Sequence, residues 1–202
     1  MPKREFKLIR HGATAMNAEG GSGVDRIRGH LDVPLNREGR REAKALADKL
    51  ADSGIKKIAC SDLLRACDTA HAIAETTGAK VFKDDDLRPW DLGKFTGQES
   101  VKVIPQIMLY AKDKPDQKIP QGESFDTFRK RAFGGLLEAL EKGADAVVTH
   151  HRVERLIKAW IAQGEQPDGE ICYRTFGKKG EHPAHAEDVS LDLAALKKAA
   201  AA

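Results

Sequence analysis

The chain has 202 residues, and its 34 Lys and Arg against 31 Asp and Glu give a net charge of +3. Hydrophobic residues make up 41% and charged residues 32%, so wholesale disorder and collagen-like structure are excluded. The small net charge and the 5% of aromatic residues argue against a nucleic-acid binder. The length predicts a single domain over residues 1–202, with a core of about 5–193, and the segment 194–202 is expected to be a frayed helix or tail.

Several features bear on the cellular location. No stretch approaches the roughly 18 apolar residues of a membrane span, and the first residues contain no apolar segment of signal-peptide length. The three cysteines, Cys60, Cys67 and Cys172, form no Cys-x-x-Cys pair, which predicts free thiols in a reducing compartment. We therefore expect a cytoplasmic protein with no membrane partner. The oligomeric state has no readable signal, and a homodimer stays open.

Strand-like and helix-like segments alternate along the chain. Apolar runs predict strands, and amphipathic spacing bounded by residues such as Asn36 and Gly78 predicts helices. The predicted strands are, in chain order, 6–9, 55–60, 80–82, 146–149, 171–176 and 189–193. The predicted helices are 37–53, 62–77, 98–112, 124–142 and 153–163. This alternation predicts a three-layer α/β/α sandwich around a mostly parallel central sheet.

Two of the predicted strands end in histidine. The first strand runs into Arg10-His11-Gly12, and the fourth runs into Thr149-His150. In open α/β sheets, ligands bind beyond the carboxyl ends of the strands. The two histidines are therefore the main clue to function.

Five segments resemble, in order, the motifs of the histidine phosphatase superfamily, also called the phosphoglycerate mutase-like fold. They lie at residues 8–17, 29–39, 61–70, 122–131 and 147–150. The first reads Leu-Ile-Arg-His-Gly-Ala-Thr, and the second contains Gly-x-x-Asp-x-Pro-Leu. The resemblance spans roughly residues 6–163 and implies a phosphatase that works without a cofactor.

The resemblance also implies roles for individual residues. His11 is implied to be the nucleophile, and a neutral imidazole can attack phosphorus near neutral pH. Arg10 and Arg65 are implied to hold the phosphate, because guanidinium groups present forked donors that stay charged. His150, in its charged form, is a further donor to a phosphate oxygen. Together these four residues would stabilise the transferring phosphoryl group.

Three further residues in or near the matched segments are candidates. Asn17 is expected to be a neutral donor to phosphate, and Arg26 occupies the position of the family's peripheral arginine. Gly12 lacks a side chain, which would let phosphate approach the backbone.

The sequence departs from the family at the proton donor. Pro89 stands where many relatives have a glutamate, and His151 stands where others have an aspartate. Asp91 is the first candidate to replace the missing acid, because a shifted backbone would bring it to the site. The alternative carboxylates are Asp84, Asp85, Asp86 and Glu123. A third resolution is a substrate that needs little protonation, such as phosphohistidine, an acyl phosphate, a diphosphate or an aryl phosphate.

We therefore expect a metal-independent phosphatase acting on phosphate esters or anhydrides, with a small phosphorylated molecule or a phosphoprotein as partner. The first alternative is a catalytically weak module that binds phosphorylated ligands. A phosphoglycerate mutase is less favoured, because it needs acid–base help at two alkyl oxygens. The histidines and carboxylates over 182–188 are expected to form a solvated loop rather than a metal site, since their spacing is loose and includes a proline.

Overall fold

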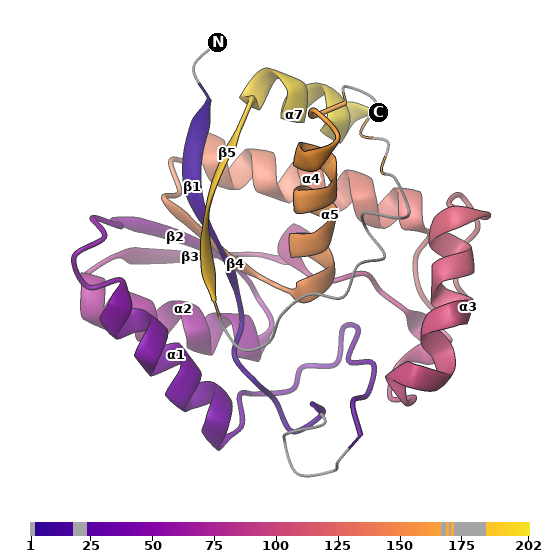
Figure 1. Ribbon diagram of the computed structural model, residues 1–202, viewed down its shortest axis with the longest axis horizontal. Coiled ribbons are helices and arrows are strands. Elements are labelled where there is room, and N and C mark those ends of the chain that lie inside the picture. Colours follow the sequence, from indigo (N-terminus) through magenta and orange to yellow (C-terminus); the bar gives the residue numbers. More distant parts are fainter. Residues whose placement is uncertain (1–2, 18–23, 167–168, 170, 172–184) are drawn as a thin grey trace.

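The computed structural model describes residues 3–17, 24–166, 169, 171 and 185–202 (Figure 1). Its strands are β1 (Arg4–Arg10), β2 (Lys57–Ser61), β3 (Lys80–Asp84), β4 (Ala146–Thr149) and β5 (Ala186–Leu191). Within the described residues they form one sheet in the order β3-β2-β4-β1-β5. The first four strands run parallel, and β5 pairs antiparallel with β1 at the edge. The prediction of a mostly parallel sheet is confirmed.

The helices follow the predicted order along the chain. They are α1 (Arg37–Lys49), α2 (Leu64–Thr77), α3 (Ser100–Lys112), α4 (Phe125–Glu141), α5 (His151–Ala162) and α7 (Leu193–Ala201). Two short 3-10 turns, η2 (Asp85–Leu87) and η3 (Gly93–Phe95), lie between β3 and α3. They occupy the segment that contains Pro89 and Asp91.

Alternating side chains of the central strands divide the interior into two cores. Leu8 and Val147 contribute to a core that includes buried residues of α4, α5 and α7. Ile9 and Val148, their chain neighbours, point to the opposite face and join a core built with α1 and α2. Because successive strand residues face opposite sides, each strand supports both layers of helices. The predicted three-layer arrangement is confirmed (Figure 1).

Local signals fix most helix ends near their predicted positions. The side chain of Asn36 accepts a hydrogen bond of 2.7 Å from the Gly39 amide and caps α1. Gly78, with φ of 73°, ends α2 in the left-handed conformation that glycine tolerates. The Ser124 side chain caps α4 by accepting from the Thr127 amide. These caps explain why the helix boundaries were readable from the sequence.

The segment 194–202, expected to be a frayed helix or tail, forms an ordered helix up to Ala201. The carboxylate of Asp192 accepts hydrogen bonds from the amides of Ala194 and Ala195 and begins α7. Leu196 and Ala199 are then fully buried in the same core as α4 and α5. A side-chain cap and a small apolar face therefore order this segment.

The end of the predicted loop over 182–188 is also corrected. From Ala186 onward the chain forms β5, because its backbone pairs with β1 over the register Ile9 with Ala186 to Arg4 with Leu191. Residues 182–184 lie outside the described residues, as does the predicted strand 171–176 apart from Ile171.

Thiols and helix length are the structural features that bear on location. Cys60 and Cys67 are free and buried, as predicted, and Cys172 lies outside the described residues. Within the described part of the chain, no helix combines the length and apolar character of a membrane span.

Candidate active site

The two histidines lie side by side at the carboxyl edge of the sheet. β1 and β4 are parallel neighbours with Arg10 opposite Thr149, so the residue after each strand reaches the same place. The His11 amide also donates to the Thr149 carbonyl at 3.1 Å. The ring centroids of His11 and His150 are 5.0 Å apart, with an interplanar angle of 63°. The predicted pairing of the imidazoles is thus present in the fold.

His11 is held in one orientation with one nitrogen free to react. Its Nδ1 lies 2.7 Å from the Gly12 carbonyl oxygen, which can only accept, so Nδ1 carries the proton. The lone pair then resides on Nε2. Burial, reinforced by the charges of Arg65 and Arg28, holds the pKa of His11 well below its usual value. The residue is therefore a neutral imidazole with a nucleophilic nitrogen.

His150 is a buried imidazole with open hydrogen-bonding capacity. It is 2% exposed, and neither ring nitrogen has a partner among the described residues. Burial, followed by the charges of Arg65 and His11, lowers its pKa well below the ordinary value. The protein without ligand therefore carries a neutral His150, whereas the charged form expected from the sequence is that of the phosphate-bound site. A bound phosphate would supply the missing partner and favour the proton.

Arg10 and Arg65 are both buried beside the histidine pair. Arg10 Nη1 lies 3.3 Å from Nδ1 of His151, the first residue of α5. Arg65 donates from Nη1 to the Leu31 carbonyl and from Nη2 to the Gly29 carbonyl, at 2.7 and 3.0 Å. Its buried Nε has no partner among the described residues. Burial is the main cause that lowers the pKa of each guanidinium to about 10, so both stay charged at neutral pH.

The two further candidate phosphate ligands, Asn17 and Arg26, lie in different surroundings. Asn17 is buried, and its Oδ1 accepts from the amide and hydroxyl of Thr14 at 2.9 and 3.1 Å. This fixes the turn after His11 and leaves the amide nitrogen as the group that can donate. Arg26 lines the cavity, but it donates to the Gly97 carbonyl at 3.0 Å and lies 3.8 Å from Glu99. It is anchored at the rim rather than beside His11.

Gly12 serves packing rather than phosphate access. A Cβ on Gly12 would lie 2.5 Å from the Gly39 carbonyl oxygen and 3.0 Å from its Cα. The chain after β1 therefore passes directly against the first turn of α1. This close approach, which the sequence did not indicate, holds His11 at the end of the strand.

Arg28 is a functional candidate that sequence reasoning missed. Its Nη1 lies 3.4 Å from the Thr14 hydroxyl, and its Nη2 lies 3.8 Å from Asp25. Its charge lowers the pKa of both His11 and His150, as well as that of Arg65. The residue stands two positions after Arg26. Side chains two positions apart in an extended segment face the same side, so this spacing could have pointed to Arg28.

Two arginines of α5 were also missed. Arg152 and Arg155 line the same cavity as His11 and His150, from the first turns of the helix that follows β4. Residues three apart share one helix face, and this spacing directly after His150 was the available signal. His151 lies between Arg155 and Arg10, with its Nε2 at 3.2 Å from Arg155 Nη1 and its Nδ1 facing Arg10.

The structure does not bring Asp91 to the histidines. Its Oδ1 accepts from the Gly93 amide at 3.1 Å, and its Oδ2 lies 4.0 Å from His30 Nδ1. Among the described residues that line the cavity, Pro89 and Trp90 are present and Asp91 is not. The backbone was not shifted in the way that the Asp91 hypothesis required.

The other carboxylates named as donors are also engaged elsewhere. Glu123 accepts from Arg131 Nη2 at 2.6 Å and from the Asp91 amide at 2.8 Å, and so holds the 89–91 segment in place. Asp84, Asp85 and Asp86 line a separate surface depression. The carboxylate that does line the cavity is Asp25, which accepts from the Ser100 hydroxyl at 2.6 Å and faces Arg28.

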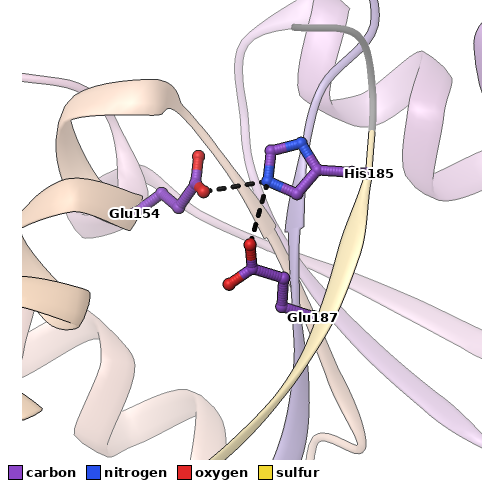
Figure 2. A group of neighbouring side chains, drawn as sticks. All are labelled: Glu154, His185 and Glu187. Carbon is purple, nitrogen blue, oxygen red and sulfur yellow. Dashed lines mark hydrogen bonds and ion pairs between the residues drawn. The ribbon is translucent and has the colours of Figure 1, made fainter. Parts of the chain in front are cut away.

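A cluster of possible metal ligands lies outside the histidine site, as Figure 2 shows. Ligand atoms of Glu154, His185 and Glu187 lie within 4.8 Å of one another. His185 Nε2 is 2.9 Å from Glu154, and Lys158 Nζ lies 3.3 Å from Glu154 and 2.7 Å from Glu187. The ammonium group contacts both carboxylates and offsets one of their two negative charges, so a further cation there would be repelled by Lys158.

Comparisons with known proteins agree with the geometry. The sequence profile of the histidine phosphatase superfamily (branch 1) matches residues 6–171. Phosphoglycerate mutase-like protein 4 of Arabidopsis thaliana is 37% identical over 161 residues, which cover 75% of this chain and 68% of the relative. A probable phosphoglycerate mutase of Proteus mirabilis is 34% identical over 150 residues, with coverage of 71% and 67%. The solved mycobacterial glucosyl-3-phosphoglycerate phosphatase shares the fold, with a TM-score of 0.71, 24% identity and coverage of 93% and 90%.

Proposed function

Because the chain belongs to the histidine phosphatase superfamily, we propose that it is a metal-independent phosphatase that forms a phosphohistidine on His11. The observation that carries the proposal is the pair of buried imidazoles, 5.0 Å apart, in a cavity lined by arginines. The cavity of about 230 Å³ suits a small phosphate ester or anhydride.

In the first step, Nε2 of His11 attacks the phosphorus atom of the substrate. The bond from phosphorus to the leaving oxygen breaks, and its electron pair departs with that oxygen. Arg10, Arg65 and His150 donate hydrogen bonds to the three other oxygens, on which the transition-state charge is spread. Guanidinium groups supply here the positive charge that a metal ion provides in other phosphatases.

In the second step, water attacks the phosphohistidine. The phosphorus–nitrogen bond breaks, its electron pair returns to Nε2 of His11, and phosphate and a proton are released. The hydrogen bond from Nδ1 to Gly12 keeps the ring in one orientation during both steps. The two-step route needs no net change in the protein.

The test is the hydrolysis of 4-nitrophenyl phosphate in the presence of EDTA. Removal of the nucleophile in His11→Ala is expected to lower kcat by about a thousandfold or more, because covalent catalysis is lost. His71→Ala changes an exposed histidine of α2 and should leave kcat unchanged. Rapid quenching should also trap an acid-labile, base-stable phosphoryl group on the wild-type protein but not on His11→Ala. Turnover that survives in His11→Ala would overturn the proposal.

A second candidate is a module that binds phosphorylated ligands without turnover. The observation that favours it is the position of Asp91, whose carboxylate faces Gly93 and His30. This candidate predicts that phosphate raises the Tm of the wild-type protein while no phosphate ester is hydrolysed. The names of the curated relatives make phosphoglycerate mutase activity a third outcome to assay directly.

A further inference from the structure

The cavity beside the histidines carries more positive charge than one phosphate needs. Five arginines line it, whereas Asp25 is the carboxylate that the described residues contribute. The arginines are Arg10, Arg26, Arg28, Arg152 and Arg155. Two carboxylates oppose part of this charge: Asp25 lies 3.8 Å from Arg28 and bonds to Ser100, and Glu99 lies 3.8 Å from Arg26. The lining is therefore complementary to an anion larger than a single phosphate.

Arg152 is the clearest excess cation. Its guanidinium lies 5.9 Å from the ring centre of Trp90, a residue that is fully buried. With the described residues it makes no hydrogen bond or ion pair. Burial, and then the charges of Arg155 and Arg28, lower its pKa to about 10, so the group stays charged among other cations. Arg152 is half-buried, and an anion in the cavity would offset the repulsion between these cations.

Arg28 and Arg152 line the same cavity as the two histidines. Arg28 lies 3.4 Å from the Thr14 hydroxyl, in the turn after His11, and Arg152 lies against the Trp90 ring. The cavity therefore holds cations in addition to the groups beside the histidine pair, and these can bind a second anion while the transferred phosphate lies at the histidines.

Among the described residues, none that lines the cavity is a carboxylic acid free to protonate a leaving alcohol. Pro89 lines the wall where the family's glutamate is expected, and Asp25 is anchored by Ser100 and Arg28. An alkoxide is a poor leaving group without such help, which is worth about 10²–10⁴-fold in rate. A phosphate leaving group needs no proton at neutral pH, and arginines can neutralise its charge directly.

We propose that the preferred substrates are phosphoanhydrides, small diphosphates whose terminal phosphoryl group passes to His11 while Arg28 and Arg152 bind the leaving phosphate. The inference rests on the proposed function and specifies its substrate class. His11 Nε2 attacks the terminal phosphorus, and the bond to the bridging oxygen breaks. The electron pair stays on that oxygen, now part of the leaving phosphate. Water then releases the second phosphate from His11, together with one proton.

Four substrates separate the parts of this proposal. Ethyl phosphate and ethyl diphosphate differ in the leaving group, and ethylene glycol bisphosphate carries a second phosphate but keeps an alcohol as leaving group. 4-Nitrophenyl phosphate has a good leaving group and no second anion, so it reports on the proposed function alone. For the wild-type protein, kcat/KM on ethyl diphosphate should exceed that on ethyl phosphate by about a hundredfold or more. General acid catalysis usually contributes at least this factor, and only the departure of the alcohol needs it.

Arg152→Gln tests the second anion site. The ratio of kcat/KM on ethyl diphosphate to kcat/KM on 4-nitrophenyl phosphate should fall by about tenfold, because one charge-assisted contact to the leaving phosphate is lost. Arg41→Gln, on the exposed face of α1, is the matched control and should leave the ratio unchanged. An unchanged ratio in Arg152→Gln would overturn the assignment of this residue.

The other outcomes are distinguishable. Equal rates on ethyl diphosphate and ethyl phosphate, with 4-nitrophenyl phosphate still cleaved through His11, would overturn the anhydride proposal and keep the phosphatase. A bisphosphate rate equal to that on ethyl diphosphate would also overturn it, because the leaving group would then not matter. If nothing is hydrolysed, the proposed function fails, and calorimetry with inorganic pyrophosphate and phosphate tests the site instead. Pyrophosphate should bind the wild-type protein at least about tenfold more tightly than phosphate, and Arg152→Gln should remove this preference.

Discussion

Two charged regions of the molecule contain histidine, and they differ in how their charges are balanced. In the cavity, His11 and His150 lie among arginines, with Asp25 as the lining carboxylate among the described residues. In the cluster of Glu154, Lys158, His185 and Glu187, each charged group contacts an opposite charge or a histidine. The two regions are linked, because the Arg10 amide donates to the His185 carbonyl.

The difference shows where a ligand is expected. The Lys158 ammonium contacts one oxygen of each carboxylate of its cluster, and within the described residues Oε2 of Glu154 is the buried atom of the cluster without a hydrogen bond. Within the part of the chain described, the cavity retains the unpartnered ring nitrogens of His150, and the Nε of Arg65, whose charge acts on both histidines, also has no partner. Buried polar groups without partners are costly, and an anion would satisfy them. Unbalanced charge, rather than the presence of histidine, distinguishes the candidate active site.

The largest effect is expected from a change in the cavity. Arg65→Gln should lower kcat on 4-nitrophenyl phosphate by about 10²–10³-fold, because a buried donor to the transition state is lost. Lys158→Gln, in the balanced cluster, should change kcat by less than about twofold, since its ion pairs are partly solvent-exposed. Steady-state kinetics on both variants measure the contrast. Equal losses would mean that the two regions do not differ as described.

A balanced ion pair next to the cavity should matter for stability. Glu123→Ala removes the partner of Arg131, whose guanidinium also donates to the carbonyls of Asp86, Arg88 and Pro89. We expect a loss of about 2–3 kcal/mol in the free energy of unfolding, because a mostly buried cation is left without its carboxylate. Urea denaturation measures it. Exposed Glu38→Ala is the control, and a loss no larger than in that variant would contradict the structural role.

The pH dependence of stability should separate the two regions. Because the pKa of His11 and of His150 lies below the unfolded value, the unfolded chain binds more protons once the pH falls below about 6.5, and stability drops with acidification. Burial opposes ionisation of Glu154, but the hydrogen bonds and charges of His185 and Lys158 together outweigh it and lower the pKa of Glu154. The stability that ionised Glu154 contributes is lost only when the pH falls below the pKa of a glutamate in the unfolded chain, about 4.5.

Thermal unfolding over this range provides the measurement. The Tm of the wild-type protein should fall between about pH 7.5 and pH 5.5, and the fall should be smaller in the double variant His11→Gln/His150→Gln. Glu154→Gln should change the profile only at more acidic pH. An identical slope in wild type and double variant over the upper range would show that the buried histidines do not titrate as inferred.

The smallest effect is expected from metal ions. Addition of Zn²⁺ should leave the Tm of the wild-type protein unchanged, because Lys158 already contacts both carboxylates of the Glu154 cluster. EDTA should likewise leave it unchanged. A rise in Tm with Zn²⁺ that disappears in His185→Ala would show that the cluster binds metal and is not balanced.

The sequence by itself determined the layered α/β architecture and the central residues of the site. Strands bounded by helices with readable caps, such as Asn36 and Gly78, depend on local chemistry that acts over a few residues. The positions of Arg10, His11 and His150 followed from strand ends, because parallel neighbours deliver their carboxyl ends to one edge.

Only the tertiary structure decided how the remaining charges are used. Asp91 turns toward Gly93 and His30, because Glu123 and Arg131 hold the backbone before it. Arg28 and Arg152, more than a hundred residues apart, meet in one cavity, and Asp192 with Leu196 fixes the final helix to the core. These outcomes depend on contacts between distant segments, which no local pattern of residues encodes.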